Sequence, residues 1–297
     1  MELRTLRSFL AVAREGNVTR AARALHITQP ALSRQLLELE RELGCELLVR
    51  ESRGVTLTDA GMLLRKRAEE IVLLADRTEL EIRSPEADVE GDVWVGGGES
   101  RAMGVVAKVA ASLAQTQPGI HLRIHSGNRD DVIERVDKGL LDFGVVFGEE
   151  PSARHDSLKL PWEDRWGMLV RSDDPLAGLE SVGFEDLLDR RLIVSGQSSS
   201  VASKDDPTIT FFGKKGYDVV ATYTLLYNAS LLVEEGVGVA VTFDGIVSTG
   251  EGTPFVFVPL RDTESISSYL VWKRYQPLSR ACEVFLRTMR DACGGAQ

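Results

Sequence analysis

The sequence has few cysteines and no long apolar run, and each of these shortages excludes a class of protein. Its 297 residues include three cysteines, Cys45, Cys282 and Cys293. A sparse, odd set without a Cys-x-x-Cys pair argues against a disulfide framework and a structural zinc site, and it favours reduced thiols. No apolar run approaches the roughly 18 residues that span a bilayer, and the longest early run, residues 9–13, is too short for a secretory signal. We therefore expect a cytoplasmic protein without a membrane span.

An overall excess of positive charge is also missing, because the net charge is -10. Residues 1–67 nevertheless hold 12 basic and 8 acidic residues, whereas the remainder is strongly acidic. A mildly basic head on an acidic body suggests that one end of the chain meets phosphate and the other does not. Hydrophobic residues make up 43% of the chain, which is enough for packed cores in about two domains.

Apolar spacing in the first 25 residues predicts two short helices. The first has apolar residues at intervals of three and four, and Gly16-Asn17 interrupts the pattern. Its apolar positions are Leu3, Leu6, Phe9, Leu10 and Ala13. The second runs over about residues 18–25 and contains Ala21-Ala22, which permits close helix approach.

A third helix follows, with a polar leading end and a leucine face. Thr28 is a suitable N-cap, Pro30 is tolerated in a first turn, and Gly44 ends the helix. Its four leucines fall within about 60° of arc, so the opposite side and the leading end face outward. These leucines are Leu32, Leu36, Leu39 and Leu43. Two short helices, a tight turn and a polar helix start favour a helix-turn-helix over a plain three-helix subdomain.

A small hairpin is expected next. Two strand-like runs, 47–49 and 55–57, flank a turn and place Arg50 and Arg53 at or near its tip. Arginines on such a wing can contact phosphates or enter a narrow minor groove. The alternative is that the two arginines only solubilise a turn.

A long helix is expected from Thr58 to about Arg83. Small and apolar residues recur along it at spacings of three and four, which is typical of a heptad seam in a coiled coil. The alternative is a helix packed on its own domain. The seam consists of Gly61, Leu64, Ala68, Ile71, Ala75, Thr78 and Ile82. Ser84-Pro85 ends this helix, and residues 86–90 form an acidic linker.

These N-terminal motifs resemble those of LysR-type transcriptional regulators. The matching segments are 9–13 (FLAVA), 21–25 (AARAL), 28–35 (TQPALSRQ), 39–44 (LERELG), 47–50 (LLVR), 53–58 (RGVTLT) and 60–61 (AG). The resemblance is dense over about the first 65 residues, and the total length also fits. It implies a winged helix-turn-helix over residues 1–58, a dimerising linker helix with a hinge over 59–90, and a bilobal α/β effector domain over 91–297. That domain is expected to be built like a type 2 periplasmic binding protein.

The resemblance also implies contacts with DNA. The positions that match operator contacts in the family are Thr28, Gln29, Pro30, Ser33 and Arg34, and those that match the wing are Arg50 and Arg53. Gln suits adenine and Arg suits guanine, whereas Ser33 and Thr28 are expected to hold phosphate and set the register. The expected partners are double-stranded operator DNA, further copies of the chain in a homodimer or homotetramer, and RNA polymerase.

Residues 91–297 alternate predicted strands and helices, which indicates an α/β architecture. Strands are expected at 93–95, 120–125, 143–147, 192–195, 219–223, 237–243 and 267–272, and helices at 103–117, 129–137, 205–212, 228–235 and 278–292. A faint repeat of 131–147 at 229–241 suggests two similar lobes. As in the family, the last strand and helix are expected to return to the first lobe. Lobe one then comprises 91–161 and 266–297, and lobe two comprises 162–265.

A small-molecule effector is expected in the cleft between these lobes, at strand carboxyl ends and helix starts. Gly98-Glu99-Ser100 and residues 195–200 follow the first strand of each lobe, and their hydroxyl and N–H groups suit an anionic or polar ligand. Small carboxylates are common effectors in the family, but Glu99 would repel an anion. It favours an amine or a hydroxyl-rich ligand, or it points outward, and both segments could be ordinary strand–helix turns. The candidate effector residues are Glu99, Ser100, Phe147, Ser195, Gln197, Ser198 and Thr242.

Motifs for enzymatic chemistry do not emerge. Gly96-Gly97-Gly98 lacks the third glycine of a dinucleotide loop, because Arg101 stands there, and Ala102 excludes a nucleophile elbow around Ser100. The histidines lie on a predicted strand or are isolated, and they are His26, His121, His125 and His155. We therefore expect no enzyme, no metal and no cofactor.

The sequence thus predicts a ligand-responsive transcriptional regulator, in which ligand binding shifts the angle between the lobes. Two other classes of protein compete with this interpretation. A solute-binding protein would share the bilobal body, but it would need an export signal and no helix-turn-helix. A nucleoid-type protein would bind DNA without sequence preference.

Overall fold

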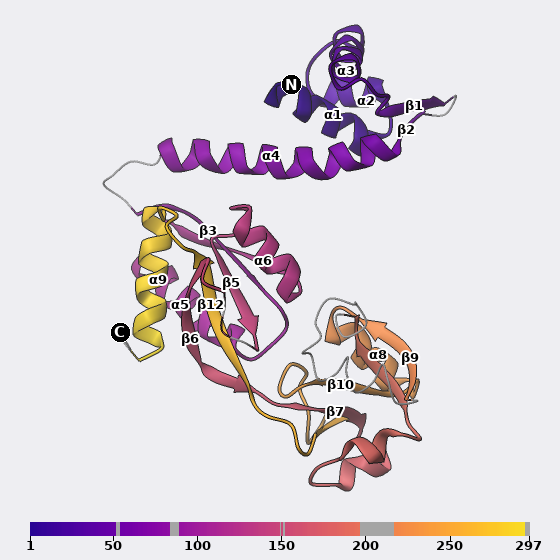
Figure 1. Ribbon diagram of the computed structural model, residues 1–297, viewed down its shortest axis with the longest axis vertical. Coiled ribbons are helices and arrows are strands. Elements are labelled where there is room, and N and C mark those ends of the chain that lie inside the picture. Colours follow the sequence, from indigo (N-terminus) through magenta and orange to yellow (C-terminus); the bar gives the residue numbers. More distant parts are fainter. Residues whose placement is uncertain (52–53, 84–88, 149, 151, 197–216, 295–297) are drawn as a thin grey trace. The chain divides into compact units, whose positions relative to one another are not determined.

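The computed structural model describes residues 1–51, 54–83, 89–148, 150, 152–196 and 217–294. It divides the chain into two compact units, Met1–Pro85 and Glu86–Gln297 (Figure 1). Each unit has its own hydrophobic core, and each is described by itself below.

The first unit opens with three helices, α1 (Leu3–Glu15), α2 (Val18–Ala24) and α3 (Gln29–Leu43). Gly16 and Gly44 end α1 and α3 in the left-handed conformation, at φ values of 58° and 70°. The side chain of Asn17 caps α2 by accepting the N–H of Arg20 at 3.0 Å. The predicted three-helix arrangement is therefore confirmed. Glycines in the left-handed conformation end α1 and α3, and the Asn17 cap starts α2.

Leucines bury one face of α3, but not all four that the spacing predicts. Leu32, Leu36 and Leu39 are at most 1% exposed and pack in the core of the unit. Leu43 is 41% exposed, so its assignment to the buried face is wrong. It is the last residue of α3, and the helix has by then passed the core that α1 and α2 form.

A hairpin and a long helix complete this unit. The hairpin pairs β1 (Leu48–Glu51) with β2 (Gly54–Leu57) in antiparallel register, and α4 (Asp59–Arg83) follows it (Figure 1). The Thr58 hydroxyl accepts the N–H of Gly61 at 3.0 Å and donates to the carbonyl of Glu46 at 2.7 Å. This bond network starts the helix directly against the hairpin.

The predicted heptad seam of α4 has two different halves. A Cβ atom at Gly61 would lie 2.1 Å from the carbonyl oxygen of Leu47, so glycine is required there by the hairpin. Ala68 is fully buried. Ile71 is 40% exposed, and Thr78 is also exposed. The first half of the seam thus packs on its own domain, and exposed positions begin at Ile71.

The second unit contains two five-stranded sheets, each of which forms one lobe. Lobe one has the strand order β4-β3-β5-β12-β6, and lobe two has the order β11-β7-β10-β8-β9. The elements of lobe one are β3 (Gly91–Gly97), α5 (Met103–Thr116), β4 (Ile120–Ser126), α6 (Arg129–Asp137), β5 (Phe143–Phe147), β6 (His155–Asp164), β12 (Ile266–Lys273) and α9 (Arg280–Ala292). Those of lobe two are β7 (Trp166–Arg171), the 3-10 helices η1 (Pro175–Gly178) and η2 (Phe184–Leu187), β8 (Arg191–Ser195), β9 (Asp218–Tyr223), α8 (Leu226–Glu234), β10 (Val239–Phe243) and β11 (Phe255–Pro259).

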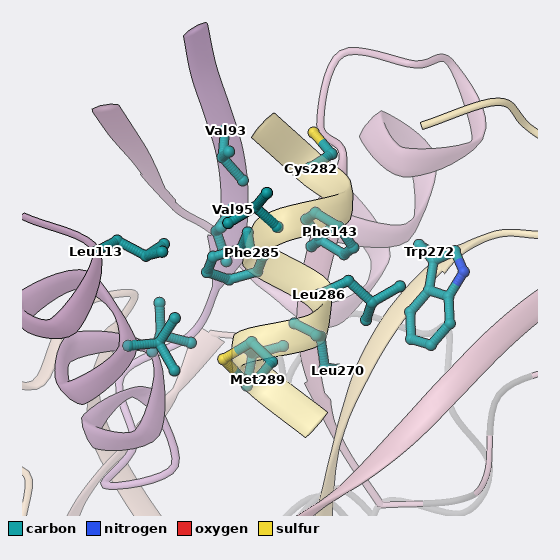
Figure 2. Close-up of a cluster of buried hydrophobic side chains, with 14 of the residues drawn as sticks. Val93, Val95, Leu113, Phe143, Leu270, Trp272, Cys282, Phe285, Leu286 and Met289 are labelled. Atoms are coloured by element: carbon teal, nitrogen blue, oxygen red, sulfur yellow. The ribbon is translucent and has the colours of Figure 1, made fainter. Parts of the chain in front are cut away.

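The C-terminal segment returns to lobe one. Strand β12 lies between β5 and β6, and α9 packs against the sheet (Figure 2). Phe285 of α9 is fully buried, with its ring centroid 5.0 Å from that of Phe143. Trp272 of β12 contacts Phe143 edge-on at 6.2 Å. These aromatic contacts hold the end of the chain on the sheet that begins at residue 91.

Three strands were not foreseen, namely β6, β7 and β11. Strands β6 and β11 are sheet edges; Pro161 within β6 disfavours a strand assignment, whereas β11 is a short apolar run, residues 255–259. The apolar run of β7 is a clear strand signal that the sequence reading missed. The first change of sheet comes between Asp164 and Trp166, after β6 ends, a few residues beyond the expected boundary at residue 161. The helix expected at 205–212 lies outside the described residues.

Candidate functional site

The start of α3 presents a cluster of polar residues. Thr28, Gln29, Pro30 and Arg34 are exposed, and Ser33 is half-buried. Thr28 occupies the N-cap position with extended backbone, but its side chain makes no capping hydrogen bond. The amide nitrogen of Gln29 instead donates to the hydroxyl of Ser33 at 2.8 Å. The structure therefore brings the predicted residues together on one outward-facing end.

The described part of the hairpin is attached to the helices by its backbone. Arg50 belongs to β1 and is paired in register with Val55 of β2. The N–H of Val55 donates to the carbonyl of Gly16 at 2.9 Å, which ties the hairpin to the turn between α1 and α2. Arg53 lies outside the described residues. The backbone of the predicted wing is thus fixed to the helical body.

The predicted effector residue Ser100 is engaged within lobe one. Its hydroxyl lies 2.9 and 2.7 Å from the two carboxylate oxygens of Asp164, and it accepts the N–H of Ala102 at 2.9 Å. Asp164, the last residue of β6, is 1% exposed and also accepts from the hydroxyl of Ser268 at 3.2 Å. Burial raises the pKa of Asp164, although these hydroxyl donors oppose the shift. Ser100 is therefore bonded to Asp164, the residue at which the chain leaves the sheet of lobe one.

Glu99, its neighbour, extends to lobe two. Its Oε2 atom accepts the backbone N–H of Leu226, the first residue of α8. Glu99 is therefore turned toward lobe two, an orientation that the sequence analysis did not consider. Nearby Tyr223 donates to the carbonyl of Val241 at 2.7 Å. Burial raises the pKa of Tyr223 to about 12, and the negative charge of Glu99 acts in the same direction.

Aromatic rings also meet between the lobes. Phe147, at the end of β5, lies edge-on to Phe243, at the end of β10, with ring centroids 5.8 Å apart. Phe243 in turn packs on Trp166 at 4.2 Å. Phe147 is thus the second predicted effector residue that the structure sets against lobe two.

The remaining effector candidates belong to lobe two. Ser195 ends β8, which pairs with β10, and it is half-buried. Thr242 is 2% exposed, and its hydroxyl donates a long hydrogen bond of 3.4 Å to the carbonyl of Phe243. Gln197 and Ser198 lie outside the described residues. The described candidates therefore occupy carboxyl ends of strands, as expected, but their polar groups differ in accessibility.

Comparison with protein families decides the classification. Residues 3–62 match the family model of the bacterial regulatory helix-turn-helix protein, lysR family, and residues 87–294 match that of the LysR substrate binding domain. The chain belongs to the LysR family. It is a DNA-binding transcriptional regulator with an effector-binding domain.

Relatives and solved structures are similar to this chain over most of its length. The uncharacterized HTH-type transcriptional regulator YnfL of Escherichia coli (strain K12) is 26% identical over 300 residues, covering 96% of both chains. The regulator YvbU of Bacillus subtilis (strain 168) is 26% identical and covers 81% of both. The crystal structure of CbnR, a LysR family transcriptional regulator, has a TM-score of 0.76 at 21% identity and covers 99% of both chains. Full-length CbnR complexed with its target DNA has a TM-score of 0.75 at 20% identity and covers 98% of this chain and 100% of that one. These structures share the fold of this LysR-family chain.

Several groups at the interlobe site of this LysR-family regulator could not be identified from its sequence. The donor at Leu226 is a backbone N–H, which almost every residue type has, so the sequence does not single it out. Asp164 ends the unforeseen strand β6, and Trp166 begins the unforeseen strand β7. The available signal was the internal sequence repeat, which aligns β5 of lobe one with β10 of lobe two.

Two histidines of the LysR-family chain are bonded to aspartates. His155, predicted to be isolated, lies 3.0 Å from the Oδ1 atom of Asp137 and 3.3 Å from the hydroxyl of Ser152. Its side chain is 2% exposed, and these bonds tie residues 152–155 to the end of α6. His125 lies 2.7 Å from Asp131. Within the described part of the chain, no group of three His, Cys, Asp or Glu side chains could hold a metal ion. No helix there is long and apolar enough to cross a membrane.

Proposed function

We propose that α3 is the recognition helix and enters the major groove of operator DNA with its first two turns. The observation that carries this proposal is an exposed polar helix start on a buried leucine face. Leu32 and Leu36 anchor the helix, whereas Gln29 and Arg34 lie on the exposed end. Arg34 is exposed, so its guanidinium is accessible to a base or a phosphate.

The individual contacts follow from side-chain chemistry. Gln29 pairs with adenine and Arg34 with guanine, because their donors and acceptors match those base edges. Thr28 and Ser33 hold phosphate oxygens, and Pro30 shapes the first turn. Arg50 and Arg53 on the hairpin contact the backbone or a narrow minor groove.

The regulator acts as a homodimer or homotetramer, because two recognition helices must reach two half-sites. The exposed apolar residues of α4 support self-association through this helix. They are Met62, Leu63, Ile71 and Leu74. We assign residues 1–58 to DNA binding, 59–90 to the linker and its hinge, and 91–297 to the effector domain.

A small-molecule effector binds between the lobes and shifts their relative angle. The proposed contacts come from Glu99, Ser100, Phe147, Ser195, Gln197, Ser198 and Thr242. The protein acts in the cytoplasm, contacts RNA polymerase and carries no catalytic activity. Support comes from the strand ends that meet at Phe147 and Phe243.

The test is selection of binding sites from a random-sequence DNA duplex library at a fixed salt concentration. A specific regulator enriches one motif with two half-sites about one helical turn, or a multiple of it, apart. A sequence-tolerant nucleoid protein enriches no motif, and that result would overturn the proposal.

Matched variants test the assigned roles. Arg34→Ala relaxes the base preference at one position of each half-site, whereas Arg53→Ala weakens binding to selected and random DNA alike. Arg41→Ala removes an exposed arginine two turns further along α3 and leaves the selected motif unchanged. Equal loss on both DNAs for Arg34→Ala would show that this residue contacts phosphate only.

A further inference from the structure

A carboxylate of lobe one is bonded to a helix start of lobe two. Glu99 follows β3, and its Oε2 atom accepts the N–H of Leu226 at the first position of α8. Leu226 is 1% exposed and belongs to the core of lobe two. The hydrogen bond therefore joins the segment after β3 in lobe one to the buried start of α8 in lobe two.

Helix α8 has no side-chain capping hydrogen bond from its own N-cap residue. Its N-cap residue is Leu225, which has no side-chain oxygen, and its first turn contains no acidic residue. The first N–H groups of a helix have no partner within the helix, and the helix dipole favours negative charge there. Glu99 supplies both the missing acceptor and the charge from a position 127 residues earlier in the chain.

Contacts of the neighbouring residues Ser100 and Arg101 fix the position of Glu99 within lobe one. Its neighbour Ser100 is bonded to buried Asp164, the last residue of β6 before the chain crosses to lobe two. The guanidinium of Arg101 lies over the ring of Trp162 at 4.5 Å, and the Arg101 side chain packs against Gly245 of lobe two. Residues 99–101 thus connect the crossover strand with lobe two.

We propose that Glu99 is a tethered carboxylate that latches the two lobes together. It occupies the acceptor position at the start of α8 that a free carboxylate would otherwise need. The latch therefore excludes small carboxylates from this position and holds the interlobe angle in the absence of a ligand. The connection of this angle to effector response rests on the proposed function, whereas the latch itself does not.

The direct test is chemical rescue in the full chain. We expect Glu99→Ala to lower the melting temperature by about 2–4 °C, the shift typical of losing one moderate interaction in a domain of this size. Sodium acetate should restore at least half of this loss in a saturable way, whereas sodium chloride at equal ionic strength should not. Acetate and chloride should act equally on the wild type, because Glu99 already fills the position.

Two controls separate the latch from general charge effects. Glu180→Ala removes an exposed glutamate of lobe two and should show no preference for acetate over chloride. Glu99→Gln keeps an oxygen acceptor but loses the charge, so it should be destabilised less and should resist acetate rescue. Should Glu99→Ala fail to fold, Glu99→Gln carries the test through its lower melting temperature.

Amide hydrogen exchange gives a second and independent measurement. A peptide covering residues 223–230 should exchange faster in Glu99→Ala than in the wild type, and in Glu99→Gln by a smaller factor. A stable Glu99→Ala that is insensitive to acetate, with unchanged exchange in this peptide, would overturn the latch. These measurements use neither DNA nor effector, so their failure is distinct from failure of the proposed regulatory function.

Discussion

The side-chain amide of Gln29 donates to the hydroxyl of Ser33 across one turn of α3, at 2.8 Å. Both residues were predicted to contact DNA separately. The bond changes this picture, because it restricts the rotamers of an exposed glutamine before DNA arrives. Such preorganisation lowers the entropy lost on binding. We therefore expect Ser33 to position Gln29, in addition to its proposed contact with the DNA backbone.

A double-mutant cycle tests this coupling. Gln29→Ala should reduce discrimination at its base pair by about 1–3 kcal/mol, because a bidentate contact is lost. Ser33→Ala should weaken discrimination at the same base pair by a smaller amount, and it should add little in the Gln29→Ala background. Titration of selected and mismatched duplexes measures both effects. Strict additivity of the two substitutions would contradict the coupling.

The leucine face of α3 gives a prediction for stability. Leu36→Ala should lower the free energy of unfolding of the first unit by about 2–5 kcal/mol, because it leaves a cavity in a packed core. Leu43→Ala is the matched control, since Leu43 is 41% exposed, and it should change stability by about 0.5 kcal/mol or less. Urea denaturation followed by circular dichroism measures both. Comparable losses at the two positions would mean that Leu43 is covered in the assembled protein.

Sequence reasoning found the helices of the first unit because their cores are built from residues close in the chain. The heptad spacing of Gly61 and Ala68 suggested a partner helix, with packing on the helix's own domain as the alternative. The structure bears out that alternative, because the Leu47 carbonyl lies against Gly61 and Ala68 is fully buried within the unit. Heptad spacing predicts that one face of a helix is buried, but it does not say whether a partner helix or the same domain buries it. The same reasoning explains Glu99, whose bonding partner is a backbone group in another lobe. Edge strand β6 was not predicted because Pro161 stands within its alternating run. The return of α9 to lobe one followed from the family resemblance.

Self-association through α4 depends on its exposed apolar residues. Leu74→Glu should weaken the oligomer at least tenfold, because burying a new carboxylate in an apolar interface is unfavourable. Leu74 is 42% exposed in the single chain, so the unit itself should stay folded. Analytical ultracentrifugation measures the dissociation constant, and circular dichroism checks the fold. Lys66→Gln, at an exposed position of the same helix, leaves the apolar positions intact and serves as the comparison. Unchanged association of Leu74→Glu would place the interface elsewhere.

Tyr223 predicts how stability depends on alkaline pH. Its pKa is raised to about 12 in the folded protein by burial, with help from the charge of Glu99, whereas an unfolded tyrosine titrates near 10. Between pH 10 and 12 the unfolded chain loses this proton and the folded chain keeps it. The free energy of unfolding therefore falls as pH rises, by up to about 1.4 kcal/mol per pH unit from this group.

Tyr223→Phe isolates this contribution. At pH 8 the variant should be less stable by about 1–3 kcal/mol, because the carbonyl of Val241 loses its donor in a buried strand. The difference between wild type and variant should then shrink above pH 10, since the variant has no phenol to titrate. Urea denaturation at pH 8, 9, 10 and 11 measures the difference, and Tyr275→Phe, at a ring that is 95% exposed, is the matched control for loss of a hydroxyl. A difference that stays constant up to pH 11 would show that the Tyr223 phenol titrates alike in the folded and unfolded chains. In that case neither its burial nor Glu99 favours the protonated phenol in the folded state.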